Sequence, residues 1–540
     1  MSRRGREGGA STAGHRRRVA AGVLAALSGV GLAVGAGVVP AAAAPAAVAA
    51  KAAVPPGLES FYSQKVEWYD CGATGGMERS AEATAFKCAK VTVPLDYSKP
   101  DGETIEIAMK KHVATGSTRL GSLFVNPGGP GGSGVEFLET TAETTFAGVQ
   151  GSYDIIGFDP RGVGASTPIT CTAGAETPAV AEAAPADAGA GGSSFEQRAA
   201  VTSAQIKQLE SGCAANTKPA GLLDHVDTVS VARDLDVLRA LSGDQQLNYA
   251  GFSYGTYLGT HYAELFPANT GRMVLDGAVD PSLTYNERRQ RQAVGFERAL
   301  RTYVDWCQAG QGCPLTDGTD AGVQQIGDLF NAANESPVPT SDPNRPVTGE
   351  EMKQVVLLFL YSPETAWGSI NEALGQVINQ NDASIFRTVL DQIAARPLVN
   401  MGAHHAVNCL DYRVEGDMAA WAEQSKELEK TAPRFGTSFE AGDLICQSWG
   451  HTGTQAPEAL HAKGAAPILV VGTTGDPATP YEWAKALAGQ LDSAQLLTWE
   501  GNGHAAYTNP GHGPCVTKAV DTYLLTGAMP KKGLTCHGQE

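Results

Sequence analysis

A serine enclosed by glycines is the residue of this chain best placed to do chemistry. Gly251-Phe252-Ser253-Tyr254-Gly255 follows a short strand-like segment at 247–250 and precedes residues 256–267, where apolar positions repeat at helical spacing. A serine in a tight turn between a strand and a helix projects its hydroxyl from the end of a sheet, where it can attack a carbonyl carbon. The flanking glycines leave room for the sharply turned backbone. The pattern predicts a nucleophile elbow, although a glycine-rich chain can produce it by chance and Ser253 alone could be an ordinary turn residue.

An acyl-transfer serine needs a base for its proton and a carboxylate to orient that base, and both have candidates further along the chain. Asp476 follows the apolar run at 467–472, and His504 follows the next strand-like run at 495–499. The order serine, aspartate, histidine is the one found in α/β-hydrolases. Alone, Asp476 could be a turn residue and His504 a surface histidine. Together with Ser253 they predict a catalytic triad at the ends of strands.

A glycine-rich loop after another expected strand could bind a developing negative charge. Residues 121–125 lead into Asn126-Pro127-Gly128-Gly129-Pro130-Gly131-Gly132. The loop lacks the lysine of a P-loop and the spacing of a dinucleotide-binding motif, so it is not expected to hold a phosphate. We expect the backbone N–H groups of Gly129 and Tyr254 to form an oxyanion hole. This chemistry requires no metal and no organic cofactor.

The N-terminal residues have the composition of an export signal. Several arginines precede an apolar run from Val19 to Val39 and a small-residue segment at 40–44. We therefore assign residues 1–44 to a signal peptide and residues 45–60 to a short pro-segment or linker. The protein is expected to be secreted, without stable membrane association after cleavage; a retained anchor is the alternative, and the export route stays open.

Cysteine content and net charge narrow the possible functions. The ten cysteines are an even number and contain no C-x-x-C pair, so an exported chain is expected to use them in disulfides rather than in a metal site. Many connectivities are possible, and pairing of sequence neighbours in order is the simplest. The formal net charge of -17 argues against nucleic acid or an anionic membrane surface as a partner.

The expected elements indicate an α/β core interrupted by a helical insertion. Strand-like runs alternate with helical stretches as far as residue 280, which is typical of a mainly parallel sheet. We expect residues 61–280 and 456–540 to form the core, with 281–455 as a mainly helical cap over the carboxyl edge of the sheet, inserted between the serine and the acid. An Ala/Gly/Pro-rich stretch at 172–194 is expected to be a mobile surface loop. The helix-like segments of the cap are 287–309, 321–334, 348–362, where Thr348 and Glu351 form a capping box, 365–380, 383–395 and 417–430.

Several motifs together resemble those of secreted tripeptidyl aminopeptidases of actinomycetes, which are α/β-hydrolases related to prolyl iminopeptidases. The elbow and the Asp-x-Arg-Gly-x-Gly motif are shared by many α/β-hydrolases, and we expect Asp159 and Arg161 of that motif to be structural. The glycine-proline loop is more specific, and Pro127 before it, in place of a histidine, is closer to the tripeptidyl branch. The motifs are Gly128-Gly129-Pro130-Gly131-Gly132, Asp159-Pro160-Arg161-Gly162-Val163-Gly164-Ala165-Ser166, the serine elbow, Gly475-Asp476-Pro477-Ala478-Thr479-Pro480 and Gly503-His504.

The resemblance implies a secreted serine exopeptidase that releases short peptides, of three residues, from free N-termini. Such an enzyme needs a carboxylate some distance from Ser253 to bind the substrate ammonium. Asp411 and Glu364 in the expected cap are candidates, although either could be a solvated or helix-capping acid. A secreted carboxylesterase with the same triad is the alternative, because the same branch contains esterases. A non-catalytic binding protein on a hydrolase scaffold is the third possibility, although such proteins usually lose the nucleophile or the base.

Overall fold

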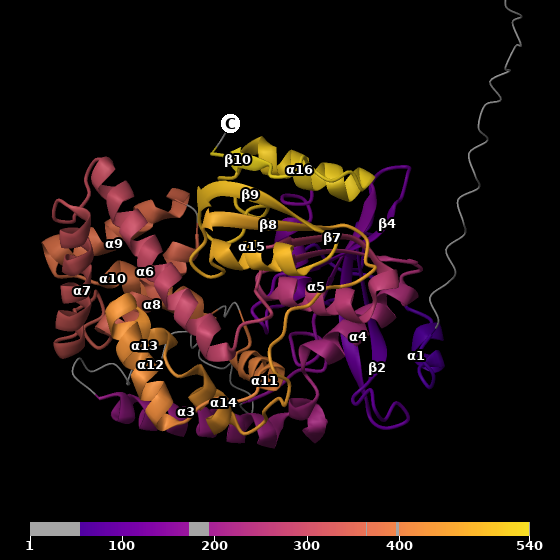
Figure 1. The fold of residues 1–540 in the computed structure, drawn as a ribbon, viewed down its shortest axis with the longest axis horizontal. Coiled ribbons are helices and arrows are strands. Elements are labelled where there is room, and N and C mark those ends of the chain that lie inside the picture. Colours follow the sequence, from indigo (N-terminus) through magenta and orange to yellow (C-terminus); the bar gives the residue numbers. More distant parts are fainter. Residues whose placement is uncertain (1–53, 172–193, 363, 396–398, 539–540) are drawn as a thin grey trace, which may run out of the picture. The chain divides into compact units, whose positions relative to one another are not determined.

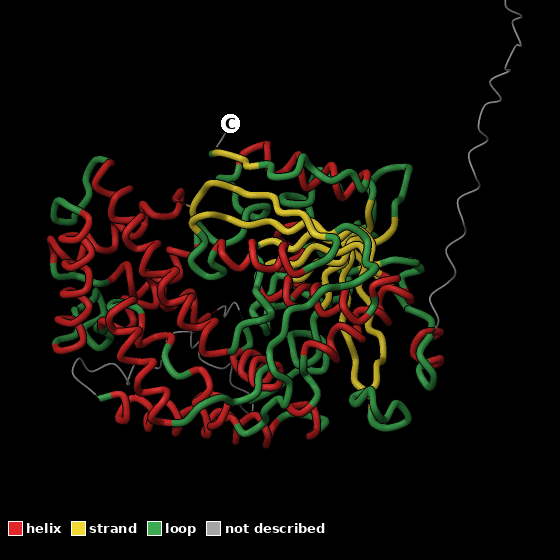
Figure 2. The backbone as a smooth tube through the Cα atoms, in the orientation of Figure 1, coloured by secondary structure: helices red, strands yellow, loops and turns green. Residues whose placement is uncertain are grey.

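Ten strands form one mixed sheet in the computed structural model, which describes residues 54–171, 194–362, 364–395 and 399–538 (Figures 1 and 2). The expected signal peptide, most of the segment at 45–60 and nearly all of the loop expected at 172–194 lie outside these residues. The strands are β1 Tyr69–Asp70, β2 Phe86–Pro94, β3 Thr104–His112, β4 Gly121–Asn126, β5 Tyr153–Phe158, β6 Leu247–Phe252, β7 Thr270–Asp276, β8 Ile468–Gly475, β9 Ala494–Asn502 and β10 Thr535–His537.

The strand order is β1-β2-β3-β5-β4-β6-β7-β8-β9-β10. Pairing is antiparallel from β1 to β5 and parallel from β5 to β10. Since parallel strands all place their carboxyl ends at the same edge, the loops after β4, β6, β8 and β9 converge there. This topology brings together the loops that carry the expected catalytic residues.

Alternating side chains of the central strands pack against helices on the two faces of the sheet. In β8, Ile468 and Val470 pack with α4 (Thr228–Leu241), α5 (Tyr254–Leu265) and α15 (Tyr481–Gln490). Leu469 and Val471 pack on the opposite face with α2 (Gly134–Thr141) and α16 (Gly513–Thr526). Both faces are covered, which explains why these strands read as continuous apolar runs. The remaining elements before the insertion are α1 Glu59–Ser63, α3 Phe195–Asn216, η1 Ala220–Asp224 and η2 Pro267–Asn269.

A helical segment lies between β7 and β8, grouped beside the sheet in Figure 1. Helices α6 to α10 share a hydrophobic core of their own, whereas α11 and α14 pack into the core of the sheet. The prediction of an α/β-hydrolase fold with a helical cap between serine and acid is confirmed. The helices are α6 Tyr285–Ala309, α7 Thr319–Glu335, α8 Gly349–Tyr361, η3 Glu364–Ala366, α9 Trp367–Gln380, α10 Ser384–Ala395, α11 Met401–Asp411, α12 Met418–Thr431, α13 Gly436–Phe439 and α14 Gly442–Trp449.

Local signals located most of these elements, with differences at short helices. Thr348 caps α8 with the expected capping box to Glu351. Helices α11 and α14 and the short strands β1 and β10 were not expected. Each of these elements is short or depends on tertiary contacts with its neighbours. Its hydrophobic repeat therefore covers too few residues to be recognised in the sequence.

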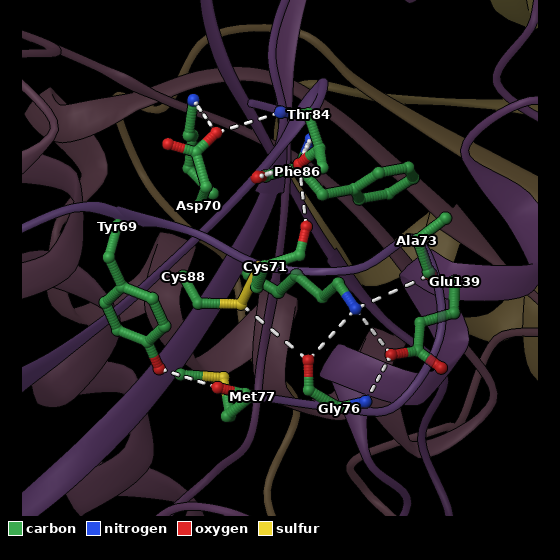
Figure 3. The surroundings of a disulfide bond; sticks show 12 residues. Tyr69, Asp70, Cys71, Ala73, Gly76, Met77, Thr84, Phe86, Cys88 and Glu139 are labelled. Atoms are coloured by element: carbon green, nitrogen blue, oxygen red, sulfur yellow. Dashed lines mark hydrogen bonds and ion pairs between the residues drawn. A yellow bond between two sulfur atoms is a disulfide. The ribbon is translucent and has the colours of Figure 1, made fainter. Parts of the chain in front are cut away.

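The disulfides join sequence neighbours in order, as the simplest connectivity predicts. In Figure 3 the first of them ties β1 to β2, near a hydrogen bond of 2.7 Å from the Gly76 N–H to Glu139 of α2. Within the described residues no cluster of potential metal ligands occurs, and no helix is long and apolar enough to span a membrane. The bridges are Cys71–Cys88, Cys171–Cys213, Cys307–Cys313, Cys409–Cys446 and Cys515–Cys536.

Candidate active site

Ser253 occupies a strained turn between β6 and α5. Its φ of 56° and ψ of -126° lie outside the regions that a non-glycine residue normally adopts, as is common where a side chain must be held for function. A Cβ on Gly251 would lie 2.3 Å from the carbonyl oxygen of Gly255, and a Cβ on Gly255 would lie 2.6 Å from that of Asn126. The glycines therefore allow the strand, the helix and the neighbouring loop to approach closely around Ser253.

The glycine-rich loop after β4 lies directly against this turn. A Cβ on Gly128 would come within 2.5 Å of the Phe252 carbonyl oxygen and 2.8 Å of the Tyr254 nitrogen. Among the described residues, neither the Gly129 N–H nor the Tyr254 N–H has a hydrogen-bond acceptor. Tyr254 is the first residue of α5, whose N-terminus carries the positive end of the helix dipole. One backbone N–H of the serine turn and one of the loop against it thus have no acceptor among the described residues.

His504 and Asp476 form a hydrogen-bonded pair. The imidazole Nδ1 lies 3.0 Å from both carboxylate oxygens, the Asp476 side chain is fully buried, and that of His504 is 16% exposed. An ionised carboxylate can only accept, so Nδ1 carries the proton and Nε2 is left as the basic nitrogen. The sequence prediction that these two residues meet at the ends of β8 and β9 agrees with this geometry.

The Asp476 carboxylate is held by the backbone of its own loop and of the histidine loop. Oδ1 accepts from the N–H groups of Ala478 and Thr479 at 2.9 and 2.8 Å, and Oδ2 accepts from the Ala505 N–H at 3.1 Å. The Thr479 hydroxyl donates to Oδ2 at 2.9 Å. These donors stabilise an ionised carboxylate in a buried place and fix its orientation toward the imidazole.

Asp276, at the end of β7, links the serine turn to the histidine loop. Its backbone carbonyl accepts from the Ser253 N–H at 3.0 Å, and its carboxylate accepts from the N–H groups of Ala506 and Tyr507. Burial raises the pKa of Asp276 to about 6. Sequence reasoning overlooked this residue, since an acid at the end of an apolar strand carries no local sign of which loops it will join.

The cap reaches the histidine loop through Tyr361 and Glu364. The His504 N–H donates to the Tyr361 carbonyl oxygen at 2.8 Å, and the two rings meet edge to face at 5.6 Å. Glu364 is exposed in η3, and its Oε1 accepts from Asn502 Nδ2 at 2.6 Å. One of the two expected ammonium-binding acids therefore lies beside the loop that carries His504.

Asp411, the other candidate, is linked to Tyr254 through Thr228. Its carboxylate accepts from the backbone N–H and the hydroxyl of Thr228, both at 2.7 Å. The Thr228 hydroxyl also contacts the Tyr254 hydroxyl. Burial raises the pKa of Asp411 to about 7, because its effect is larger than that of the two Thr228 hydrogen bonds, which lower the pKa. Both oxygens of this acid are thus engaged within the protein.

Asp159 and Arg161 serve the structure, as expected. Arg161 is completely buried and forms a bidentate ion pair with Asp234 at 2.7 Å. Asp159 accepts from the Ser133 hydroxyl and from the Ala165 N–H. The motif therefore joins the start of α2 to the loop after β5.

Comparison with known proteins identifies the family of this chain. Residues 432–536 match the family model described as "TAP-like protein". The chain is 33% identical to "Serine protease Hip1" of Mycobacterium tuberculosis, over 88% of this chain and 92% of the relative. It is 32% identical to "Tripeptidyl aminopeptidase" of Streptomyces coelicolor (87% and 86%) and 34% identical to "Carboxylesterase B" of Mycobacterium tuberculosis (85% and 87%). The chain is a serine hydrolase that belongs to the tripeptidyl aminopeptidase-like family of α/β-hydrolases.

Proposed function

We propose that the chain is a secreted serine exopeptidase that releases short peptides, of three residues, from free N-termini, with Ser253, His504 and Asp476 as the triad. The observation that carries the triad is the His504–Asp476 pair, whose Nδ1 lies 3.0 Å from both carboxylate oxygens at the same edge of the sheet as the serine turn. The relatives named as a protease and a tripeptidyl aminopeptidase support a peptide substrate. The five disulfides and the export-type N-terminus support secretion.

The reaction is acyl transfer. His504 Nε2 accepts the Ser253 proton while Oγ attacks the substrate carbonyl carbon, and Asp476 stabilises the imidazolium that forms. His504 then gives the proton to the leaving amine, and a water molecule resolves the acyl-enzyme by the same route in reverse. Apart from the substrate and water, these steps use only side chains and backbone groups of the chain.

The Gly129 and Tyr254 N–H groups bind the oxyanion in this mechanism. Tyr254 follows Ser253, and Gly129 follows Gly128, which lies against the serine turn; both N–H groups lack acceptors among the described residues, so they are ready to donate when negative charge develops. A preorganised donor of this kind typically contributes about 3 kcal/mol to transition-state stabilisation. The close approach of Gly128 to the Tyr254 nitrogen brings the glycine-rich loop and the serine turn, which supply the two donors, together.

Glu364 is our first choice for the acid that binds the substrate ammonium. A tripeptide in extended form spans roughly 10 Å, so that acid must lie away from the serine but face the same site. Glu364 is our candidate for this position because it is exposed and bonded to Asn502, at the end of the strand that leads to His504. Asp411 is the second choice, since both of its oxygens already accept from Thr228.

A secreted carboxylesterase with the same triad is the alternative, favoured by the relative named "Carboxylesterase B". The triad and the oxyanion donors serve both reactions equally. Only recognition of a free amine separates them. The enzymes among the relatives argue against the third possibility, a binding protein without catalytic activity.

The deciding experiment compares a tripeptide anilide, its N-acetylated form and a short-chain aryl ester on the purified protein. Acetylation removes the ammonium charge and leaves the acid unpaired in the complex, which typically costs about 2–5 kcal/mol, or roughly 30- to 4000-fold in kcat/KM. An esterase should treat the two peptides alike and prefer the ester. A ratio below about threefold would contradict the exopeptidase proposal and leave the triad proposal intact.

Glu364→Gln then tests the assignment of the acid. Glutamine keeps an oxygen for Asn502 and removes only the charge, so the preference for the free amine should collapse while hydrolysis of the ester persists. Glu372→Gln, which removes an exposed charge on α9, is the matched control. If Glu364→Gln keeps the full preference, Asp411→Asn is the next variant, and persistence in both would exclude both acids.

A further inference from the structure

Helix α11 contacts the glycine-rich loop directly. His404 Nδ1 lies 3.1 Å from the carbonyl oxygen of Pro130, and the Asn400 N–H donates to that of Gly131 at 3.1 Å. A Cβ on Gly131 would lie 2.8 Å from the Asn400 carbonyl oxygen, so no side chain separates the two segments. The loop after β4 is therefore fixed from the side of the cap as well as from the side of the serine turn.

The hydrogen bonds of His404 have one consistent direction. A carbonyl oxygen only accepts, so Nδ1 must donate to Pro130, and Nε2 then accepts from Asn408 Nδ2 at 3.1 Å. Arg288 Nη2 lies 3.1 Å from Asn408 Oδ1, and because a guanidinium only donates, it fixes the orientation of that amide. The network from Arg288 through Asn408 and His404 to Pro130 thus fits a neutral imidazole with its proton on Nδ1.

The surroundings of α11 keep this network in place. His404 is 2% exposed and Asn408 is completely buried. The Cys409–Cys446 disulfide joins α11 to α14. A Cβ on Gly402 would lie 2.3 Å from the Cys171 sulfur, so the helix also packs closely against a second disulfide. A helix held near both of its ends can position a hydrogen bond accurately.

We propose that His404 is a positioning residue for acyl transfer, whose hydrogen bond to the Pro130 carbonyl fixes the loop so that the Gly129 N–H points at the oxyanion. This inference rests on the proposed acyl transfer at Ser253. A single peptide, Gly129–Pro130, separates the Pro130 carbonyl group from the peptide that carries the Gly129 N–H, so a shift of this carbonyl is transmitted to the donor. His404 contacts no reacting atom in this role. Its loss should lower kcat, where charge develops on the oxyanion, and leave KM nearly unchanged.

Two amide substitutions separate this hydrogen bond from simple packing. In His404→Asn the side-chain amide nitrogen occupies roughly the position of Nδ1 and can still donate to Pro130. In His404→Gln the amide nitrogen occupies roughly the position of Nε2 and faces Asn408 instead. We expect His404→Gln to lower kcat about 10- to 100-fold with KM within about threefold of the wild type, and His404→Asn to restore most of the loss. His404→Leu, which matches asparagine in shape without a donor, should resemble His404→Gln and replaces it if the glutamine variant does not fold.

The readouts are kcat and KM for an aryl ester, expressed per active serine by titration with a serine-directed phosphonate. The matched control is His405→Asn, on the same helix, where the ring lies against Trp449 at 5.9 Å instead of the loop; its kcat should be close to that of the wild type. Equal losses in the asparagine and glutamine variants, or a change in KM alone, would overturn the proposal. Failure of the phosphonate to label the wild type at Ser253 would instead refute the proposed function, so the two failures are distinguishable.

Discussion

Replacing Asp476 by asparagine should disable the base without disturbing the fold around it. The asparagine oxygen should remain where Ala478 and Thr479 donate at 2.9 and 2.8 Å, because an amide nitrogen there would oppose two N–H groups. The amide nitrogen then takes the position of Oδ2, which is 3.0 Å from His504 Nδ1. It can only donate, so a hydrogen bond from it to Nδ1 requires the imidazole proton to move to Nε2, in competition with the retained oxygen, which also lies 3.0 Å from Nδ1. In that tautomer Nε2 cannot take the proton of Ser253.

The expected loss in kcat is about 10⁴-fold, the size typical of a wrong histidine tautomer, which corresponds to about 5 kcal/mol. The effect on stability should be smaller. The Ala505 N–H, which donates to Oδ2 at 3.1 Å, would face an amide nitrogen, and an unsatisfied buried donor typically costs about 1–3 kcal/mol. The variant should therefore fold with a modestly lower Tm and label slowly with a phosphonate.

Asp276→Asn is the matched control for this prediction. Asp276 is completely buried and accepts from the Ala506 and Tyr507 N–H groups of the same loop. Asparagine should destabilise that loop by a similar amount, with less than a tenfold loss in kcat, because the His504–Asp476 pair survives. The assays are kcat on an aryl ester at several pH values and Tm. An Asp476→Asn enzyme within tenfold of the wild type, or an equal loss in Asp276→Asn, would refute the reasoning.

Three further predictions concern the nucleophile, the disulfides and a buried acid. Ser253→Ala should abolish phosphonate labelling and lower kcat by several orders of magnitude, and label that persists would reveal another nucleophile. Reduction of the purified protein should lower Tm, since a bridge typically contributes about 2–4 kcal/mol, and an unchanged Tm would contradict a stabilising role. Burial raises the pKa of Asp411 to about 7, so the stability it contributes is present below its unfolded pKa of about 4 and is lost as pH rises through 7. Asp411→Asn should therefore gain Tm relative to the wild type between pH 5 and pH 8; parallel pH profiles of Tm would contradict this.

The sequence predicts the elements that carry their own local signals. The serine turn, the buried strands around it and the Thr348 capping box depend on residues within a few positions of one another. Strand ends then place Asp476 and His504 at one edge, because parallel pairing from β5 to β10 aligns all carboxyl ends. Order along the chain and the rule for parallel sheets therefore predicted that Asp476 and His504 meet, and that a helical segment separates β7 from β8.

Local sequence signals could not predict the residues that act through contacts with distant parts of the chain. His404 is one of eleven histidines, and its hydrogen-bond partner Pro130 lies 274 residues away in the chain. Asp411 and Glu364 were candidates because they are acids in the expected cap, but the sequence does not show that Thr228 engages one of them and Asn502 the other. Hydrogen-bond partners of this kind are set by tertiary packing, which a single sequence does not display.

The cap contacts the loops that do chemistry as well as covering them. Tyr361 accepts from the His504 N–H at 2.8 Å, and Gln292 of α6 donates to the Ala478 carbonyl oxygen at 2.9 Å, beside the acid. Asn400 reaches the glycine-rich loop through Gly131. Because the cap joins the loops after β4, β8 and β9, a shift of its helices would alter the orientation of the proposed base, acid and oxyanion donors together. Substitutions in the cap are therefore expected to change kcat, and not only the choice of substrate, wherever they loosen one of these backbone contacts.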